Sequence, residues 1–259
     1  MNPPLPQSNL RWLNKVPEAT LAFWIIKIMS TTVGETVADY LAVNAGLGKA
    51  VTNGVMAVLL TLALSVQLRS RRYTPWIYWL TVVLVSVVGT QITDTLTDSL
   101  KISLFISTVV FCIGLATIFV LWYRNERTLS IHTIVTRRRE LFYWSAILCT
   151  FALGTAAGDL ATEALSLGFQ VGVIIFGILI ALVWTAFRLG ADAVLTFWLA
   201  YILTRPLGAS LGDLLSQAKT YGGLGLGAML TSVIFLTIII GLVALAQVSA
   251  TKGTKTTSP

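Results

Sequence analysis

Long apolar segments alternate with short polar ones along the whole chain. Eight of these segments approach or exceed the roughly 20 residues that an α-helix needs to cross the hydrocarbon core of a bilayer. They cover residues 18–44, 48–69, 75–98, 101–123, 140–165, 169–189, 191–217 and 223–247. Because backbone groups cannot be hydrated inside a bilayer, this pattern predicts an all-α fold, a polytopic membrane protein with eight transmembrane helices.

The first, third, fifth and seventh segments carry the same spaced motif. An aromatic residue and a Trp are followed after nine residues by Gly, and after four more by Asp. The four copies are Phe23-Trp24…Gly34…Asp39, Tyr78-Trp79…Gly89…Asp94, Tyr143-Trp144…Gly154…Asp159 and Phe197-Trp198…Gly208…Asp213. Trp accounts for only 8 of 259 residues, so this register is not accidental, and the motif identifies an internal repeat.

Each repeat contains two helices, so residues 1–259 are predicted to form a single membrane domain of four helical hairpins. The predicted repeats cover residues 18–69, 75–123, 140–189 and 191–247, with a cytoplasmic connector at 124–139 and a disordered tail at 249–259. An even number of spans returns the chain to the side from which it started. The four repeats are therefore parallel in the membrane, and the apolar second helices are predicted to shield the first ones.

The position of the motif in the bilayer suggests a role for each of its parts. Trp opens the first helix of every repeat and is predicted to anchor it in the headgroup layer. The Asp lies about 22 Å further along the helix, and the Gly near mid-membrane, where it permits close helix contact or bending. The second copy has an additional Asp98, and the fourth has Ala209 where others are polar. These departures favour a two-fold arrangement of unequal pairs over strict four-fold equivalence.

Seven of the 11 Asp and Glu residues lie in or directly after these motifs. Three pairs have the spacing i, i+4, and the fourth copy keeps an amide oxygen at the second position. Since residues four apart share a helix face, the first helices are predicted to present a polar ion pathway. Its members are Thr31, Glu35 and Asp39, then Ser86, Thr90, Asp94 and Asp98, then Thr155, Asp159 and Glu163, then Asp213 and Gln217.

Carboxylates inside a bilayer are costly, by ~2.5–3.5 kcal/mol each on insertion scales, and usually mark a bundle interior or an ion pathway. Four equivalent acids on parallel repeats are predicted to converge and to act as metal ligands or proton carriers: Asp39, Asp94, Asp159 and Asp213. Glu35 and Glu163 are expected to be further ligands or relay groups. Such acids cannot all ionise side by side without protons or a bound cation.

The two cations within the spans, Lys27 and Arg205, compensate only part of this negative charge and are expected to shift the pKa values of the carboxyl groups. A bound divalent cation would balance the remainder. Oxygen ligands suit the hard ions Mn²⁺, Mg²⁺ and Ca²⁺, whereas softer metals prefer thiolate or imidazole. No covalent cofactor is expected.

Composition and charge support a membrane protein and exclude a nucleic-acid-binding one. Hydrophobic residues make up 56% of the chain and charged residues 11%, against about 25% charged in soluble domains. The net charge of +7 follows topology, because the loops on one side hold only Lys49, Lys101 and Lys219. By the positive-inside rule both termini are cytoplasmic. The expected partners are membrane lipids, protons and a small cation, and a homo-oligomer is compatible with the sequence.

Three segments resemble a bacterial family of integral-membrane proteins described as membrane-anchored proteins and built from a repeat of unknown function. They are VPEATLAFWIIKIMSTTVGETVADYL at 16–41, ERTLSIHTI at 126–134 and RRRELFYWSAILCTFALGTAAGDLATE at 137–163. The resemblance covers nearly the whole chain and implies four tandem two-helix repeats in a bacterial inner (plasma) membrane. It implies no particular activity, so function has to be inferred from the site.

The sequence predicts a secondary transporter that moves a hard, Mn²⁺-like divalent cation and is coupled to protons through the intramembrane Asp residues. A proton-coupled exporter of a small organic solute, with aromatic residues lining its cavity, is the first alternative, and a channel is another. A third alternative is a non-transport sensor or scaffold in which the acids only cap or cross-link helices. An enzyme is not expected, because no nucleophile and base lie together at one membrane depth.

Overall fold

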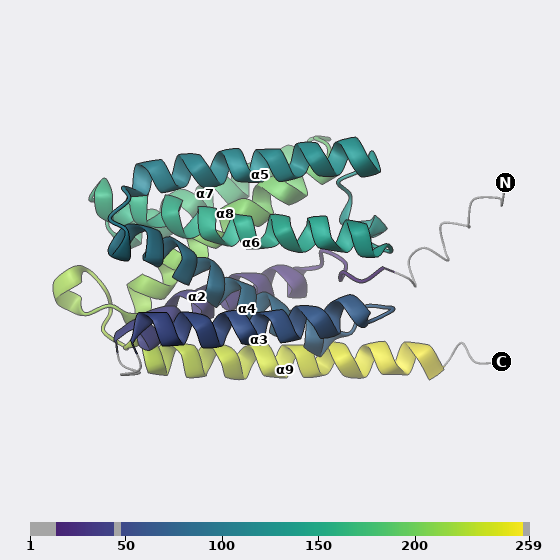
Figure 1. Cartoon of the computed structure of the whole chain (residues 1–259), viewed down its shortest axis with the longest axis horizontal. Helices are drawn as coiled ribbons and strands as arrows, with labels where there is room; N and C mark the ends of the chain where they lie inside the picture. The colour runs from purple at the N-terminus through teal and green to yellow at the C-terminus, as the bar shows by residue number, and fades with distance from the viewer. Residues whose placement is uncertain (1–13, 44–47, 256–259) are drawn as a thin grey trace.

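The computed structural model describes residues 14–43 and 48–255, apart from the side chains of residues 43, 163 and 249–255. Within this part of the chain, eight helices are long and apolar enough to cross a membrane (Figure 1). They are α2 (Leu21–Val43), α3 (Lys49–Arg69), α4 (Pro75–Asp94), α5 (Leu104–Glu126), α6 (Arg137–Asp159), α7 (Phe169–Arg188), α8 (Ala193–Ser216) and α9 (Ala228–Lys255). The predicted all-α, polytopic fold class is therefore confirmed.

Four short helical segments complete the order of elements. Two π-helical turns extend inner helices directly after a motif Asp: η1 (Thr95–Ser99) follows α4 and η3 (Leu160–Ala164) follows α6. Two 3₁₀ turns lie in loops, η2 (Ile131–Thr133) and η4 (Lys219–Tyr221). The last helix, α9, includes residues 249–255 of the predicted disordered tail, while residues 256–259 lie outside the described part.

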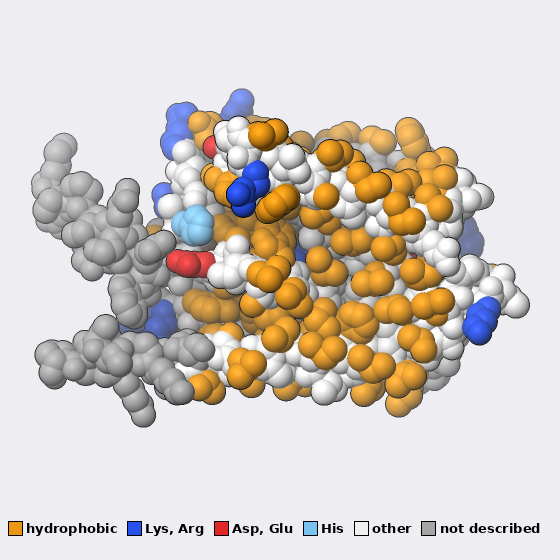
Figure 2. Space-filling view, turned by 180° about the vertical axis from the view of Figure 1, so that it is seen from behind, with side chains coloured by type: hydrophobic (Ala, Val, Ile, Leu, Met, Phe, Trp, Pro, Cys, Tyr) orange, Lys and Arg blue, Asp and Glu red, His pale blue; other side chains and the backbone are white. Residues whose placement is uncertain are grey.

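The eight helices form an inner group and an outer group. In the most apolar stretch of α2, α4, α6 and α8, between 50% and 72% of residues are buried, whereas in α3, α5, α7 and α9 the share is 11% to 22%. Hydrophobic side chains cover the middle of the face shown in Figure 2, and most of the Lys and Arg side chains visible there lie near its two ends. A belt of this kind suits lipid, so the outer helices shield the inner ones as predicted.

The motif glycines join the four inner helices into a closed ring. A Cβ atom added to any of them would overlap the residue three positions before the motif glycine of the next inner helix. The pairs are Gly34 with Ser86, Gly89 with Phe151, Gly154 with Arg205, and Gly208 with Thr31. The ring thus runs from α2 through α4, α6 and α8 back to α2, with the same register at each crossing. The predicted two-fold arrangement of unequal pairs is wrong for these crossings, whose register repeats four-fold.

Each outer helix packs mainly against the inner helix of the following repeat. The extensive contacts are α3 with α4, α5 with α6, α7 with α8, and α9 with α2, whereas α2 and α3 of the first hairpin touch only slightly. Because α9 packs on α2, the last repeat is fastened to the first, and no hairpin buries its apolar surface by itself.

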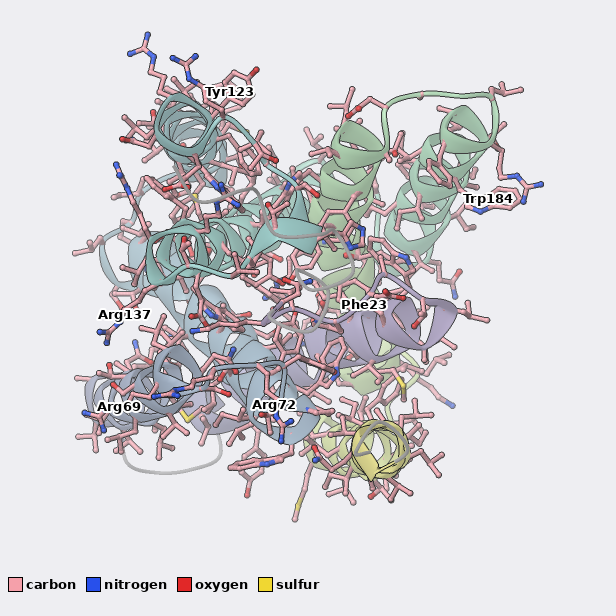
Figure 3. All side chains as sticks on the ribbon, turned by 90° about the vertical axis from the view of Figure 1, so that its right-hand side faces the viewer. Phe23, Arg69, Arg72, Tyr123, Arg137 and Trp184 are labelled. Atoms are coloured by element: carbon pink, nitrogen blue, oxygen red, sulfur yellow. The ribbon has the colours of Figure 1, made fainter. Side chains whose placement is uncertain are left out.

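The two ends of the bundle differ. The N-termini of the inner helices and residues 127–136, which include η2, lie at one end, called here the connector end. Residue 48 and the loops at 100–103, 165–168 and 217–227 lie at the other, the hairpin end. Figure 3 looks onto the connector end, where Arg69, Arg72 and Arg137 are labelled. The Trp198 indole donates to the Leu129 carbonyl oxygen at 2.9 Å, which ties the connector to α8.

The aromatic residues of the motif close the connector end of the ring from inside. Three of the four motif Trp residues are buried, and their rings contact other motif aromatics: Trp79 with Phe23, Trp144 with Tyr78, and Trp198 with Tyr143. The Tyr78 and Tyr143 hydroxyl groups are hydrogen-bonded at 2.6 Å. The prediction that Trp anchors these helices in the headgroups is wrong for the buried three, because four parallel copies turn the same residues towards one axis, where they bury each other.

The glycine contacts can be tested by adding a single methyl group. We expect Gly154→Ala to destabilise the protein by ~1–3 kcal/mol, because its Cβ would overlap the stem of Arg205 on α8. Gly177→Ala on outer helix α7 is the matched control, since no atom lies within 4 Å of its added Cβ. The control should be neutral or stabilising by up to ~1 kcal/mol. Unfolding of the purified proteins in detergent measures both, and equal stability of the two variants would contradict the ring packing.

Candidate metal centre

A polar column runs through the middle of the ring along one face of α2. Lys27, Thr31, Glu35 and Asp39 follow each other at intervals of four residues and therefore lie on the same side of the helix. Lys27 and Thr31 are fully buried, Glu35 is 5% exposed and Asp39 is half-buried. The column becomes more acidic towards the hairpin end.

Lys27 lies at the connector side of this column, below the aromatic layer. Its ammonium group lies 4.2 Å from the centre of the Phe151 ring and 4.4 Å from that of Tyr201. It also donates to the Thr31 hydroxyl at 3.2 Å. Described Asp and Glu residues form no salt bridge with it, so its stabilisation comes from ring faces and one hydroxyl.

Arg205 connects all four inner helices. From α8 its guanidinium reaches α2, donating to the Thr31 carbonyl oxygen at 3.2 Å and lying 3.1 Å from a Glu35 carboxylate oxygen. It reaches α6 through the Phe151 carbonyl oxygen at 3.2 Å and the Thr155 hydroxyl at 2.6 Å, and α4 through the Thr90 hydroxyl. The predicted charge compensator is thus also the main polar cross-link of the bundle.

Three carboxylates meet next to this guanidinium. One oxygen from each of Glu35, Asp159 and Asp213 lies within 4.8 Å of the other two. Glu35 and Asp213 are buried and Asp159 is half-buried. These residues come from α2, α6 and α8, and we call them the acid triad. In the described part of the chain this group can hold a metal ion.

The other predicted pathway residues have different surroundings. Asp39 accepts a hydrogen bond from the Gln217 amide at 3.3 Å. Asp94 lines a small cavity between α2, α3 and α4. Asp98 is exposed and pairs with Lys49 at 2.9 Å. The predicted metal group of four motif Asp residues therefore differs from the triad, in which Glu35 joins Asp159 and Asp213.

The remaining predicted residues position the column. Thr90 and Thr155 hold the Arg205 guanidinium, and Thr90 also donates to Glu35 at 3.3 Å. Ser86 packs against Gly34 at the crossing of α2 and α4. The side chain of Glu163 lies outside the described part of the structure, so its predicted ligand role is untested.

The triad has the geometry and charge of a site for a hard cation. Two oxygens on opposite sides of one Ca²⁺ lie roughly 4.8 Å apart, because each is bound at about 2.4 Å, and smaller ions need a modest approach of the ligands. Three carboxylates with a single adjacent guanidinium carry an excess of negative charge when ionised. Protons or a cation must balance that excess, because like charges so close together disfavour full ionisation.

Sequence analysis missed a second buried charged cluster, at the connector end. Glu140, fully buried, lies 2.6 Å from the Lys15 ammonium and accepts from the Gln67 amide at 3.1 Å. Lys15 also donates to the Leu68 carbonyl oxygen at 3.3 Å. The pair joins the segment before α2 to α3 and α6. No repeated signal marked these residues, because the other three copies have no acid at the position of Glu140.

The Arg205 cross-link generates a prediction about stability. Arg205→Met should cost ~3–5 kcal/mol, because it leaves Glu35 without its buried partner. Adding Glu35→Gln removes that charge, so the double variant should be less destabilised than the sum of the single variants by at least ~1 kcal/mol. The free energy of unfolding of the purified protein in detergent is measured for both single variants and for the double variant.

A control separates this effect from the general loss of an arginine. Arg188→Met removes an exposed guanidinium at the end of α7, next to the Trp184 ring, and should change stability by about 0.5 kcal/mol or less. Strictly additive effects of Arg205→Met and Glu35→Gln would show that the pair does not contribute to the fold as described.

Comparison with known proteins agrees with the repeat analysis. Four segments of the chain match the family described as Repeat of Unknown Function (DUF347), at residues 22–73, 77–128, 142–190 and 196–251. Each matched segment contains most of one inner helix and all of the outer helix that follows it, except that the last segment ends within α9. Neither the curated proteins nor the solved structures contain a match to the chain. Because the four segments cover most of its residues, the chain belongs to the DUF347 family.

Proposed function

We propose that this protein is a secondary transporter that exchanges a hard divalent cation, with Mn²⁺ as the first candidate, for protons. The observation that carries the proposal is the acid triad, in which Glu35, Asp159 and Asp213 bring carboxylate oxygens within 4.8 Å of one another inside a membrane bundle. Carboxylates at such depth usually belong to an ion or proton pathway. A hard divalent cation is the ligand that suits an all-oxygen group.

The charge balance of the site supports exchange. Three ionised carboxylates and the Arg205 guanidinium leave an excess of two negative charges, as three minus one gives two. One divalent cation or two protons neutralise that excess. Because both compete for the same oxygens, cation binding releases protons, and a proton gradient can drive the cation across the membrane.

The surroundings of the triad support alternating access from the hairpin end. Half-buried Asp39 and Gln217 lie on that side, while Lys27 and the aromatic layer close the column towards the connector end. The inner helices meet at glycines, so each crossing has a side chain on one helix only and brings the two backbones close together. Rocking of one pair of inner helices against the other would open the opposite side while the triad stays in place.

The organic-solute exporter has less support. It needs aromatic side chains that line a cavity, whereas the rings of Phe23, Trp79, Tyr143 and Trp198 pack against other aromatic rings. A sensor or scaffold would use the buried acids only to hold helices together. That alternative predicts that neutral amides can replace them without loss of activity, which the flux experiment below decides.

The distribution of basic residues supports the proposed orientation, with both termini in the cytoplasm of a bacterial cell. Arg69, Arg72 and Arg137 lie at the connector end, while Lys49 begins α3 at the hairpin end. We expect a green fluorescent protein fused after residue 259 to fluoresce and an alkaline phosphatase fused there to be inactive. The reverse pattern would place the hairpin end in the cytoplasm.

The transport mechanism predicts which acids cation flux requires. In proteoliposomes with an imposed pH gradient, wild-type protein should take up Mn²⁺ and release about two protons per ion. Asp159→Asn and Asp213→Asn should each lower the flux by about tenfold or more, because each removes a ligand and a charge. Uptake of Mn²⁺, Mg²⁺ and Ca²⁺ is measured together with the internal pH.

A matched variant controls for the Asp-to-Asn change. Asp192 is exposed and caps α8 by accepting from the Leu195 amide at 2.8 Å, and Asn is an equally good cap. Asp192→Asn should keep wild-type flux. If the triad variants are folded and their flux equals that of Asp192→Asn, the transport mechanism is wrong and the sensor or scaffold alternative is favoured.

A further inference from the structure

A second polar site lies outside the acid triad, near the hairpin end. It is a cavity of about 10 Å³ between α2, α3 and α4, which holds about one water-sized guest. Its walls carry a carboxylate from Asp94, an amide from Gln91 and hydroxyl groups from Thr52 and Thr95. The triad is built by α2, α6 and α8, so the two sites share only one helix.

An unsatisfied acceptor faces this cavity. Gln91 is 6% exposed, and its Oε1 atom accepts no hydrogen bond from any described residue. Gln91 and Asp94 are three residues apart on α4 and thus share the face that lines the cavity. A buried acceptor left unpaired is costly, so a positively charged or hydrogen-donating guest would stabilise the site.

The other wall oxygens also present lone pairs. The Thr52 hydroxyl donates its proton to the carbonyl oxygens of Gly48 or Lys49, and the Thr95 hydroxyl donates to that of Gln91 at 2.6 Å. Asn53 donates to Thr95 at 3.0 Å, so this hydroxyl is fixed in its orientation. The cavity is therefore lined by the Asp94 carboxylate, the unpaired Gln91 Oε1 atom and the Thr52 hydroxyl oxygen, together with the side chains of Lys49 and Asn53.

We propose that this cavity binds one small monovalent cation of the size of Na⁺, held by the Asp94 carboxylate and the Gln91 amide oxygen. A single carboxylate with neutral oxygens balances one positive charge. A divalent ion would keep an uncompensated charge here and is better served by the triad. If the proposed transport function holds, the site is placed to couple a second ion to the cation that the triad carries.

Several charged groups face Asp94 from the helices around it. Lys49 on α3 lines the same cavity, Glu35 and Asp39 lie on α2, Asp98 follows in η1, and Arg205 reaches in from α8. The Lys49 ammonium lies 2.9 Å from Asp98, and both side chains are about half exposed. Because Lys49 pairs with Asp98, no salt bridge with a described residue neutralises the Asp94 carboxylate, and a bound cation would do so.

Thermal unfolding of the purified protein in lipid nanodiscs tests the site without any transport assay. NaCl is titrated against choline chloride at constant ionic strength and in the presence of a chelator. A ligand that binds only the folded state raises the midpoint, so wild type should show a saturable rise with Na⁺ and not with choline. Asp94→Asn should abolish the rise or weaken the apparent affinity about tenfold or more.

Two further variants keep the experiment decisive. Ala42→Val fills the cavity from α2 without touching the charge of Asp94, and it should also lose the Na⁺ response. Asp159→Asn alters only the triad and should keep it, whatever happens to Mn²⁺ flux. An equal rise with choline, or an unchanged Na⁺ response in both Asp94→Asn and Ala42→Val, overturns the proposal and leaves a cavity for water.

Discussion

The fold and the site depend on one buried interaction, the contact of the Arg205 guanidinium, carried by α8, with the other three inner helices. Two hydroxyl groups, two carbonyl oxygens and the Glu35 carboxylate surround it at 0% exposure. Inside a membrane bundle, each of these polar groups would be costly without a partner. The same group sets the charge of the acid triad, so the interaction that joins the helices also prepares the site for a cation.

Such an arrangement is possible because the backbones come close. The motif glycines remove side-chain bulk at each crossing. The space is filled by a residue of the neighbouring inner helix, three positions before the motif glycine of that helix. That position is occupied by Thr31, Ser86, Phe151 and Arg205 in the four repeats. A four-fold backbone thus carries four different side chains at the same level, and the chemistry of the column comes from this loss of symmetry.

The position directly after the motif glycine shows the same divergence. It holds Glu35, Thr90, Thr155 and Ala209. One copy supplies an acid, two supply hydroxyl groups that orient Arg205, and one is apolar. The repeat therefore predicted which positions face the axis, but not which of these residues would contact one another to form a ligand group. Ligand groups form between side chains of different helices, and these pairings depend on helix rotation and depth, which the spacing along a single helix does not encode.

The sequence by itself determined the eight spans, the four repeats, the division into polar inner and apolar outer helices, and the face of α2 that carries the column. These follow from hydropathy and helical periodicity, which act locally. Only the tertiary structure decided that each outer helix packs on the next repeat, that the motif Trp residues turn inward, and that Glu35 joins Asp159 and Asp213. Lys15 and Glu140 also met only on folding, because residues 125 positions apart share no local pattern.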